Sequence, residues 1–472
     1  MPSALEEVLS IRNAEVAPEE VAIVGADPVY STPFRIGETC AAVLGGIGTA
    51  VNDLWALKTD RRQKVRVDVR AAAAALRSTS HMDRLEADGR WTSIVSPGHM
   101  DMRKITQPWP TKDGRWFLPH FGLPNLKARV LDVLGCEPNP ESVATAVADW
   151  TAMDLEAAID EARACGAMVR TNAEWMAHPH GQALAAKPIV EIIKIGDSDP
   201  EPMSAGPRPL SGIRALDLTR ILAGPIAART LAEHGADVLM VAGKGVPQIP
   251  EHVLDTSHGK RSSFLNLKDR DDAERLMTLI KDADVFSQGY RPGVMEKLGF
   301  GPEDLAAARP GIVCASISCF GADGPLSHRA GWEQVAQTVT GICHDGRPDR
   351  PTLLPAAACD YTTGYLAAYG ILLALARRAR EGGSYHVRAS LCQSGMFIYR
   401  QGQTAFEREE MGLHTDELDR LRTTTTTEQG TFRHLGPVLG LSETAPHWTR
   451  PTPVLGGDQP IWTDSGLPSA AE

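Results

Sequence analysis

Residues 213–218 read Ile-Arg-Ala-Leu-Asp-Leu and are followed, at 224–225, by Gly-Pro. The first run has the length and apolar content of a buried strand, and the Gly-Pro pair marks the start of a helix. Strand and helix patterns then alternate as far as residue 345, with strands expected at 236–241, 263–267, 283–286 and 311–317 and helices at 226–234, 271–281 and 293–298. Strands separated by helices of this length predict an α/β protein with a Rossmann-like parallel sheet.

Other units flank this sheet in the sequence. Thr111-Lys112-Asp113-Gly114 is a turn into a short strand at 115–118, and helices are expected at 125–134 and 153–164. These elements predict a smaller α/β domain. The divisions expected for the chain are a partial helix–strand unit at 1–100, the small domain at 101–197, a proline-rich linker at 198–210, the sheet domain at 211–400 and a C-terminal tail at 401–472 that packs on the sheet domain.

The unit at 1–100 repeats a pattern found later in the chain. A small, apolar segment is followed by a basic turn and an alternating strand, first at 39–57, 58–64 and 65–69, and again about 320 residues later at 364–375, 377–380 and 387–391. A repeat at this distance is too long for a solenoid and predicts a duplicated, trimmed unit. The position that matches Asp360 in the first copy holds Glu38, which we expect to be vestigial.

Asp360 stands in Leu-Pro-Ala-Ala-Ala-Cys-Asp-Tyr-Thr-Thr-Gly, residues 354–364, in front of an almost uncharged run. Two roles are open for its carboxylate. It caps the start of the following helix, with Thr363 in a similar role, or it is a partly desolvated nucleophile whose charge the helix dipole stabilises. The local residues favour the cap, and the motifs of the flanking 150 residues favour the nucleophile.

Polar residues gather at the expected strand ends. Lys260 and Arg261 precede one expected strand and Lys268 follows it, while Gln288-Gly289-Tyr290-Arg291 leads from another strand into a helix that carries Lys297. Such a helix start with Arg291 would suit a phosphate group. Taken alone, each of these cations is most simply a solvated surface charge, because most charged side chains in proteins are exposed. Glu333 is either a helix-surface residue or a second carboxylate of the site.

The composition excludes several classes of function. A formal net charge of −11 argues against general nucleic-acid binding, and the eight scattered cysteines form neither a CxxC pair nor a Cys/His cluster, so no metal is expected. There is no G-x-G-x-x-G after the first strand and no G-x-S-x-G, which disfavours a dinucleotide site and a serine hydrolase. His234, His258 and His328 are expected on loops or the surface. No signal sequence or membrane span is read at the start or elsewhere, so a cytoplasmic protein is expected.

Taken in the order in which they follow along the chain, the motifs resemble those of the family III CoA-transferases (the CaiB/BaiF family), which include formyl-CoA transferase and carnitine CoA-transferase. The segments that carry the resemblance are 213–225, 235–238, 259–262, 265–268, 290–294, 316–321 and 364–370. Residues 105–195 are similar to the small domain of the family, and 435 onward to its C-terminal tail. The resemblance implies the family's fold, but with a rearranged domain order, because here the small domain precedes the sheet domain.

The resemblance also implies a reaction and its residues. An aspartate at the position of Asp360 is the family's nucleophile: it forms a mixed anhydride with the acyl group of an acyl-CoA and then an aspartyl-CoA thioester. Glu333 falls where a transferase keeps a carboxylate. Coenzyme A enters as the acyl-CoA substrate and no metal is needed. The CoA contacts implied are Ile221, Leu265, Lys268, Gln288, Gly289, Tyr290, Arg291 and Lys297. An interlocked homodimer is expected, with acyl-CoA and carboxylic acid substrates and neither nucleic acid nor membrane as a partner.

Two other functions stay open. An α-methylacyl-CoA racemase, or another acyl-CoA isomerase or lyase, belongs to the same family, but proton transfer needs a histidine base opposite the aspartate, and the matching place reads Gly331-Trp332-Glu333. A catalytically degenerate CoA-binding subunit is the non-enzymatic alternative. It is favoured by the domain order and by the absence of a glycine-rich lid loop between 105 and 195.

Overall fold

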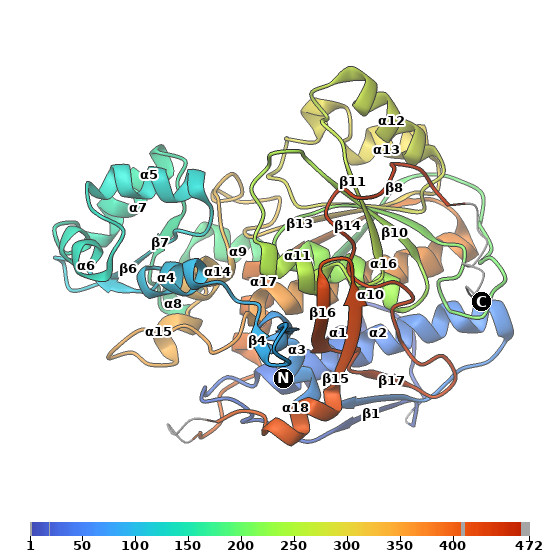
Figure 1. Cartoon of the computed structure of the whole chain (residues 1–472), viewed down its shortest axis with the longest axis horizontal. Helices are drawn as coiled ribbons and strands as arrows, with labels where there is room; N and C mark the ends of the chain where they lie inside the picture. Colours follow the sequence, from blue (N-terminus) through green and yellow to red (C-terminus); the bar gives the residue numbers. More distant parts are fainter. Residues whose placement is uncertain (1, 18, 407–410, 464–472) are drawn as a thin grey trace.

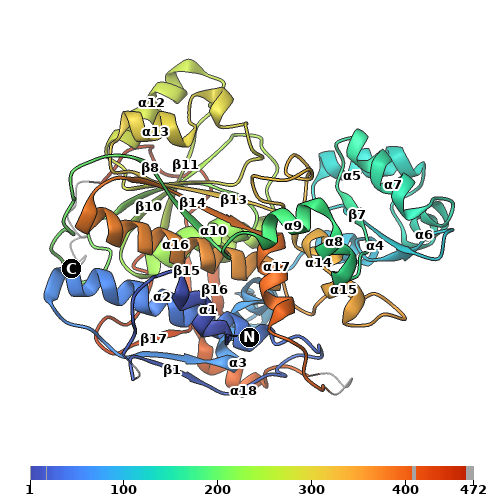
Figure 2. The same cartoon turned by 180° about the vertical axis from the view of Figure 1, so that it is seen from behind.

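The computed structural model of the chain describes residues 2–17, 19–406 and 411–463. Figure 1 shows a main body and a smaller lobe that stands to one side of it, and Figure 2 shows the same arrangement from behind. Parts of the tail expected at 401–472 lie outside the described residues. The main body is organised around a seven-stranded sheet.

The seven strands run in the order β11-β10-β9-β12-β13-β14-β8. Neighbouring strands pair in parallel from β11 to β14, and β8 joins the edge antiparallel to β14. The bounds are β8 Glu191–Gly196, β9 Arg214–Leu218, β10 Asp237–Ala242, β11 Lys260–Phe264, β12 Val285–Gln288, β13 Val313–Ser318 and β14 Ser384–Ser390. The parallel strands follow the doubly wound order, in which ligands sit beyond the strand ends where the winding reverses, here between β9 and β12. The predicted Rossmann-like sheet is confirmed.

Helices cover both faces of this sheet. Leu276, Leu279 and Leu305 of α12 and α13 pack on one face, whereas α10 and α16 lie against the other (Figure 1). The bounds are α10 Ala223–Glu233, α11 Pro250–Thr256, α12 Arg270–Lys281, α13 Pro302–Ala308, α14 Glu333–Val339, α15 Ile342–Asp345, α16 Ala358–Glu381 and α17 Leu391–Arg400. Helix α16 crosses from β13 towards β14, so its first turn lies near the carboxyl edge of the sheet.

The N-terminal unit packs beneath α16. Its long helix α2 runs beside α16 in both views (Figures 1 and 2), and each of the two helices has 24 residues. Helix α2 is also long and apolar enough to cross a membrane, yet 89% of its most apolar window is buried inside the protein, as expected for a core helix. The bounds are α1 Ala4–Ser10, β1 Val21–Val24, α2 Ile36–Thr59, β2 Val65–Asp68, α3 Val69–Ala75 and a 3₁₀ turn at Ser78–His81.

Chain segments from both ends complete the unit below α16. Strand β17 pairs with β2, and β16 of the C-terminal segment pairs with β3. The chain ends therefore meet in two small sheets, β1-β2-β17 and β15-β16-β3-β4. The bounds are β3 Asp83–Leu85, β4 Trp91–Ser93, α18 Thr415–Leu421, β15 Arg422–Thr427, β16 Gly430–Leu435 and β17 Leu439–Leu441.

The small lobe has its own apolar core. Phe117, Val130, Val143 and Leu155 are among the side chains that fill it, and they come from a strand and three helices. The bounds in this part of the chain are α4 Pro97–Ile105, β5 Trp109–Pro110, β6 Trp116–Pro119, α5 Pro124–Leu134, α6 Pro140–Ala148, α7 Ala152–Glu161, β7 Gly166–Met168, α8 Asn172–Ala177 and α9 Pro179–Ala185. The strand and the two helices expected here are present, and α6 was not predicted.

Two local predictions are wrong. The strand expected at 263–267 is β11, Lys260–Phe264, so Lys260 and Arg261 lie within the strand and not before it. Lys260 tolerates this position because its Nζ pairs with Asp217 at 2.8 Å, with both side chains fully buried. The helix expected near 293–298 is only a 3₁₀ turn at Glu296–Leu298. Lys260 and Arg261, both paired with aspartates, are therefore not free cations at the strand ends. Within the described residues, the segment 288–298 contains no α-helix that could point its N-terminus at a ligand.

Gly364 lets α16 approach α10 closely. A Cβ atom at this position would lie 2.4 Å from the carbonyl oxygen of Ala223 and 2.8 Å from Cβ of Ile226. We expect Gly364→Ala to lower the free energy of unfolding by about 1–3 kcal/mol, because the backbone of α10 must shift. Urea unfolding measures this. The matched control is Gly98→Ala in α4, where a Cβ meets nothing within 4 Å, and it should leave stability unchanged or raise it slightly. Equal effects of the two changes would contradict the packing argument.

Candidate active site

Asp360 lies in the first turn of α16, and Glu333 is the first residue of α14. Both are buried, with 6% and 3% of their surfaces exposed. The Asp360 backbone N–H donates to Oε2 of Glu333 at 2.5 Å, and that of Cys359 donates to Oε1 at 3.1 Å. Gln337 Nε2 donates to the same Oε1 at 2.5 Å. Glu333 therefore caps the helix that carries Asp360, and the carboxylate of Asp360 is left out of that role.

Burial changes the acidity of both carboxyl groups. Loss of hydration raises the pKa of Asp360 well above its usual range, and the nearby charge of Glu333 raises it further. Burial raises the pKa of Glu333 to about 7, against the lowering effect of its hydrogen bonds from Gln337 and the two backbone N–H groups. Two like charges this close disfavour full ionisation of the pair, so its last proton is lost only above the usual range of a carboxyl group. A carboxylate of this kind is more basic than a solvated one.

A cavity of about 730 Å³ opens on Asp360 and Glu333. Its wall is formed by the segment after α3, by the residues from α4 to His120, by the loop after β9, by α11 and by the segment from Arg347 to Tyr361. All three parts of the chain, the N-terminal unit, the small lobe and the sheet, contribute to it. The cavity is within the usual size range for small-molecule sites, and three of the predicted site residues, Asp360, Glu333 and Ile221, line it.

Ile221 lines the cavity with a strained backbone. Its φ is 74°, in the left-handed region, which a β-branched residue rarely occupies. Ile221 lies in the loop three residues after the end of β9, beside the point where the winding of the sheet reverses. Backbone strain of this kind costs on the order of 1–3 kcal/mol and is found mostly where the surrounding structure fixes a functional loop.

The other predicted CoA contacts lie outside this cavity, near the carboxyl ends of β11 and β12. Leu265 is buried in the core with α12, while Lys268, Gly289, Arg291 and Lys297 are exposed. Gln288 is buried: its Nε2 donates to Oγ of Ser316 at 3.0 Å, and its Oε1 accepts from the backbone N–H of Tyr290. Gln288 and Tyr290 line a second cavity of about 90 Å³. The structure thus groups the predicted residues in two places. The guanidinium of Arg220, next to Ile221 in the sequence, lies 5.9 Å from the ring of Tyr290.

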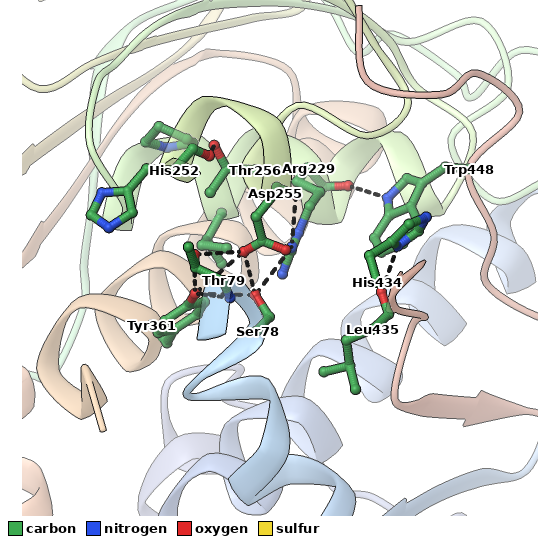
Figure 3. Close-up of polar contacts among 12 residues, drawn as sticks. Ser78, Thr79, Arg229, His252, Asp255, Thr256, Tyr361, His434, Leu435 and Trp448 are labelled. Atoms are coloured by element: carbon green, nitrogen blue, oxygen red, sulfur yellow. Dashed lines mark hydrogen bonds and ion pairs between the residues drawn. The ribbon is translucent and has the colours of Figure 1, made fainter. Parts of the chain in front are cut away.

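Behind Asp360, a buried polar network holds the first turn of α16 (Figure 3). Asp255 of α11 accepts hydrogen bonds from Ser78 Oγ at 2.5 Å and Thr79 Oγ1 at 3.0 Å. Its other oxygen pairs with Arg229 of α10 at 3.2 Å. The Tyr361 hydroxyl joins the same group, since the backbone N–H of Thr79 donates to it at 3.3 Å. Four separate segments are therefore fixed together one residue from Asp360.

Aromatic rings extend this network towards the C-terminal segment. Trp448 Nε1 donates to the carbonyl of Arg229 at 3.2 Å, and the Arg229 guanidinium lies 5.4 Å from the Trp448 ring (Figure 3). His258 stacks on His434 with ring centroids 3.8 Å apart. His234 and His258 lie in turns, as expected, but both are buried with 1% of their surface exposed, whereas His328 is exposed. Burial lowers the pKa of His234 to about 3, so its imidazole enters the core uncharged.

Several residues that line the 730 Å³ cavity could not be identified from the sequence alone. Arg77 and Thr79 follow an alanine run that predicts only a helix, and His120 lies in the small lobe, more than 200 residues before Glu333. The His120 ring packs against Trp332 in a tilted arrangement with centroids 4.8 Å apart, and its Nε2 is 2.9 Å from Gln334 Oε1. Burial lowers its pKa to about 4, so the ring is neutral near pH 7. Only long-range folding places these side chains in the cavity.

The first copy of the repeat preserves one feature of this arrangement. Asp27 Oδ2 accepts the backbone N–H of Glu38 at 2.8 Å, as Glu333 accepts that of Asp360. The Glu38 side chain, however, is partly exposed, pairs with Arg35 and does not line the 730 Å³ cavity. Within residues 2–17, 19–406 and 411–463 there is no group of three or more His, Cys, Asp or Glu side chains that could hold a metal ion.

Glu333 is expected to make stability depend on pH. The folded-state pKa of about 7 lies above the ordinary 4.5, so between these values the folded chain holds a proton that the unfolded chain has lost. Stability therefore falls as pH rises from about 4.5 to about 7. In Glu333→Gln this contribution is absent. We expect the free energy of unfolding of the variant, relative to the wild type, to increase across that window in urea titrations at fixed ionic strength. A difference that does not vary with pH would contradict the assignment.

Parts of the chain are similar to known proteins. Residues 210–411 match the family model of CoA-transferase family III. The chain is 34% identical over 322 residues to acetyl-coenzyme A transferase nodX of Hypoxylon pulicicidum, covering 63% of this chain and 54% of that protein. It is 28% identical over 412 residues to an acyl-CoA transferase of Gibberella moniliformis, covering 80% and 72%.

Among other relatives the match is shorter. Succinyl-CoA:glutarate CoA-transferase of Mus musculus is 34% identical over 204 residues, which are 40% of this chain and 46% of that protein. The chain thus spans about half the length of several curated relatives it matches. Among solved structures, Rv3272 from M. tuberculosis is similar over 41% of this chain and 58% of that chain, with 29% identity and a TM-score of 0.39.

Proposed function

We propose that the chain is a CoA-transferase that moves CoA from an acyl-CoA donor to a carboxylic acid acceptor. One observation carries the proposal: a buried aspartate, Asp360, opens on a large cavity while a second carboxylate, Glu333, occupies the backbone N–H groups that would otherwise neutralise it. Both residues lie in the segment that matches the family, and the names of the relatives support the same reaction class.

The proposed reaction begins with attack of an Asp360 carboxylate oxygen on the thioester carbonyl of the donor. The C–S bond breaks, giving a mixed anhydride and CoA thiolate. The thiolate then attacks the aspartyl carbonyl, forming an aspartyl-CoA thioester and releasing the donor acid. The acceptor carboxylate repeats these steps in reverse and leaves as the new acyl-CoA. No water or oxidant is consumed, and one thioester is exchanged for another.

The proposed roles of the surrounding residues follow from their positions. Burial makes the Asp360 carboxylate more basic and keeps water away from the anhydride. Glu333 holds the first turn of α16 through the backbone of Cys359 and Asp360. Ile221 would contact the thioester end of the acyl-CoA. The remaining predicted contacts, along the ends of β11 and β12, would hold the nucleotide part: Leu265, Lys268, Gln288, Gly289, Tyr290, Arg291 and Lys297.

The cellular location, the oligomeric state and the substrates of the enzyme belong to the same proposal. We propose a cytoplasmic homodimer that takes acyl-CoA and carboxylic acid substrates and needs no metal. The net charge of −11 is unfavourable for nucleic acid as a partner. The domain boundaries at 100, 197, 210 and 400 remain the proposed ones, except that β8, Glu191–Gly196, belongs to the sheet and not to the small lobe. Light scattering tests the dimer, and a monomer at micromolar concentration would contradict it.

Turnover by the purified chain alone tests the function. The chain is incubated with a panel of acyl-CoA donors and carboxylic acid acceptors, and new acyl-CoA is measured by mass spectrometry. Hydroxylamine added with the donor should trap Asp360 as a hydroxamate, identified in the peptide that contains it. Absence of both transfer and trapping across the panel would instead support a degenerate CoA-binding subunit.

One observation favours a second function, α-proton transfer on an acyl-CoA. The segment at 331–333 has no histidine, but His120 from the small lobe lines the same cavity, is neutral near pH 7 and packs against Trp332. A neutral imidazole is a suitable base for such a proton. Deuterium exchange at the α-carbon in D₂O, without acyl transfer, would establish this reaction and overturn the transferase.

A further inference from the structure

The two carboxyl groups of the site differ in the hydrogen bonds that they receive. Glu333 accepts three: from the backbone N–H of Cys359 at 3.1 Å, from that of Asp360 at 2.5 Å and from Gln337 Nε2 at 2.5 Å. All three partners are N–H groups, which can only donate. In residues 2–17, 19–406 and 411–463 no group donates a hydrogen bond to the carboxyl of Asp360, which lines the cavity. A negative charge is therefore better stabilised on Glu333 than on Asp360.

Gln337 supplies the one side-chain donor of this set. It lies one turn after Glu333 on α14 and is 1% exposed. Its Oε1 accepts the backbone N–H of Leu354 at 2.7 Å, and because a backbone N–H can only donate, this bond fixes the amide with its nitrogen towards Glu333. The same Nε2 lies 3.5 Å from the carbonyl oxygen of Ala356. With both ends of the amide engaged, Gln337 cannot turn to offer Glu333 an acceptor.

The loop that Gln337 contacts leads directly into α16. Leu354 and Ala356 line the cavity, and Ala357 is the residue before the helix. Ala357 has no side-chain group that could accept from the free N–H groups of the first turn, so that turn depends on Glu333. Gln337 thus holds both the loop before the helix and the carboxyl group that caps it.

We infer that Gln337 is a positioning residue that keeps Glu333 as the ionised member of the pair, so that the proton shared by the pair lies on Asp360 in the free protein. The inference rests on the proposed transferase function. Asp360 then attacks the thioester only after its proton has passed to solvent through the cavity. The proton returns once the new acyl-CoA has left, so that no proton is consumed in a turnover.

The other titratable groups around the pair do not compete with this arrangement. The thiols of Cys319 and Cys359 face the two carboxyl groups, and burial raises the pKa of each thiol well above its usual range, so both are neutral near pH 7. Arg229 of α10, which packs against α16, is already paired with a carboxylate of α11. Among the described residues, the charge of Glu333 is the only one that shifts the pKa of Asp360. A change at Glu333 is therefore transmitted directly to Asp360.

The test is the pH dependence of kcat/KM for the acyl-CoA, which reports groups of the free protein, in Gln337→Met. Methionine keeps the length of the side chain and removes its polar contacts. Without the amide donor, Glu333 keeps its proton to higher pH, and the charge that opposes ionisation of Asp360 is then absent. We expect the acid limb of the profile to move to lower pH by about one pH unit, the order expected for one hydrogen bond to a charged group. A limb at the same pH as in the wild type would overturn the inference.

Gln63→Met is the matched control. Gln63 is 4% exposed, and its Oε1 accepts the backbone N–H groups of Glu443 and Thr444, both at 2.9 Å, in a part of the chain that does not line the cavity. Thermal unfolding should show a loss of stability comparable with that of Gln337→Met, because each change removes a buried amide that bridges backbone groups. The acid limb of kcat/KM should stay in place in Gln63→Met. A limb that moves equally in both variants would show that the effect comes from stability and would overturn the role of Gln337.

A ¹³C NMR titration reads both carboxyl groups without turnover. The side-chain carboxyl carbons of Asp and Glu are labelled, and the two resonances are assigned by their loss in Asp360→Asn and Glu333→Gln. We expect Glu333 to ionise at lower pH than Asp360 in the wild type, and the two titrations to draw together in Gln337→Met. Asp360 ionising first in the wild type, or titrations unaltered in the variant, would overturn the inference whether or not the chain transfers CoA. Absence of all transfer, with Asp360 ionising last, would overturn the transferase and leave the assignment of the proton in place.

Discussion

Replacing Asp360 by alanine is expected to reduce CoA transfer by about four orders of magnitude or more, the usual cost of removing a covalent nucleophile. The side chain is buried at the wall of the cavity, and alanine offers no oxygen to form the anhydride. Initial rates of acyl-CoA formation measure the loss. In the same experiment hydroxylamine should label the Asp360 peptide of the wild type and leave the variant peptide unchanged in mass.

The fold should survive this change, because Asp360 does not cap its own helix. Glu333 performs that role through its hydrogen bonds to the backbone of Cys359 and Asp360, which alanine retains. The matched control is Asp271→Ala, which removes an exposed aspartate from the first turn of α12 and should leave the transfer rate within about twofold of wild type. Full activity of Asp360→Ala would end the nucleophile assignment and return this residue to a structural role.

Replacing Asp255 by asparagine is expected to lower the free energy of unfolding by about 3–5 kcal/mol, the usual cost of breaking a buried ion pair by removing one partner. Asp255 has no exposed surface, and its partner Arg229 is only 4% exposed. The amide keeps the shape of the side chain but leaves the guanidinium charge uncompensated. It also turns one hydrogen-bond acceptor for Ser78 and Thr79 into a donor.

Urea unfolding of the purified variant measures this loss. The matched control is Asp416→Asn, which removes an exposed pair with Arg420 on α18 and should have no measurable effect. Removing both buried partners together, with Arg229→Met added to Asp255→Asn, should cost less than the Asp255 change alone, since no unpaired charge remains. A double variant that is less stable than either single variant would contradict this account of the network.

The sheet was predictable from the sequence because its strands are short apolar runs and the helices between them have a 3.6-residue pattern. The error at β11 has a definite cause. Lys260 looks like the residue before a strand, and only the buried Asp217 on the neighbouring strand allows a charged residue within it. A cross-strand pair of this kind depends on strand order, which no local pattern contains.

The site was predictable only in part. Asp360 and Glu333 were found because each stands in a recognisable motif near the sheet, and the structure brings them into contact. Arg77 and His120 were not found, because they come from the N-terminal unit and the small lobe and meet the site through tertiary packing. The histidine missing from the local sequence near Trp332 is supplied instead from a distant segment, which sequence spacing could not reveal.

The hydrogen bond between Thr79 and the Tyr361 hydroxyl spans 282 positions of the chain. During synthesis the Ser78–Thr79 segment leaves the ribosome long before Tyr361 is made, so it must wait in water without Asp255 or Tyr361 to satisfy its hydroxyl groups. The entropy of closing so long a loop is recovered only when these distant segments dock. The wall of the cavity is therefore complete only when segments from both halves of the chain are present, and an N-terminal fragment that ends before Asp360 cannot contain the whole site.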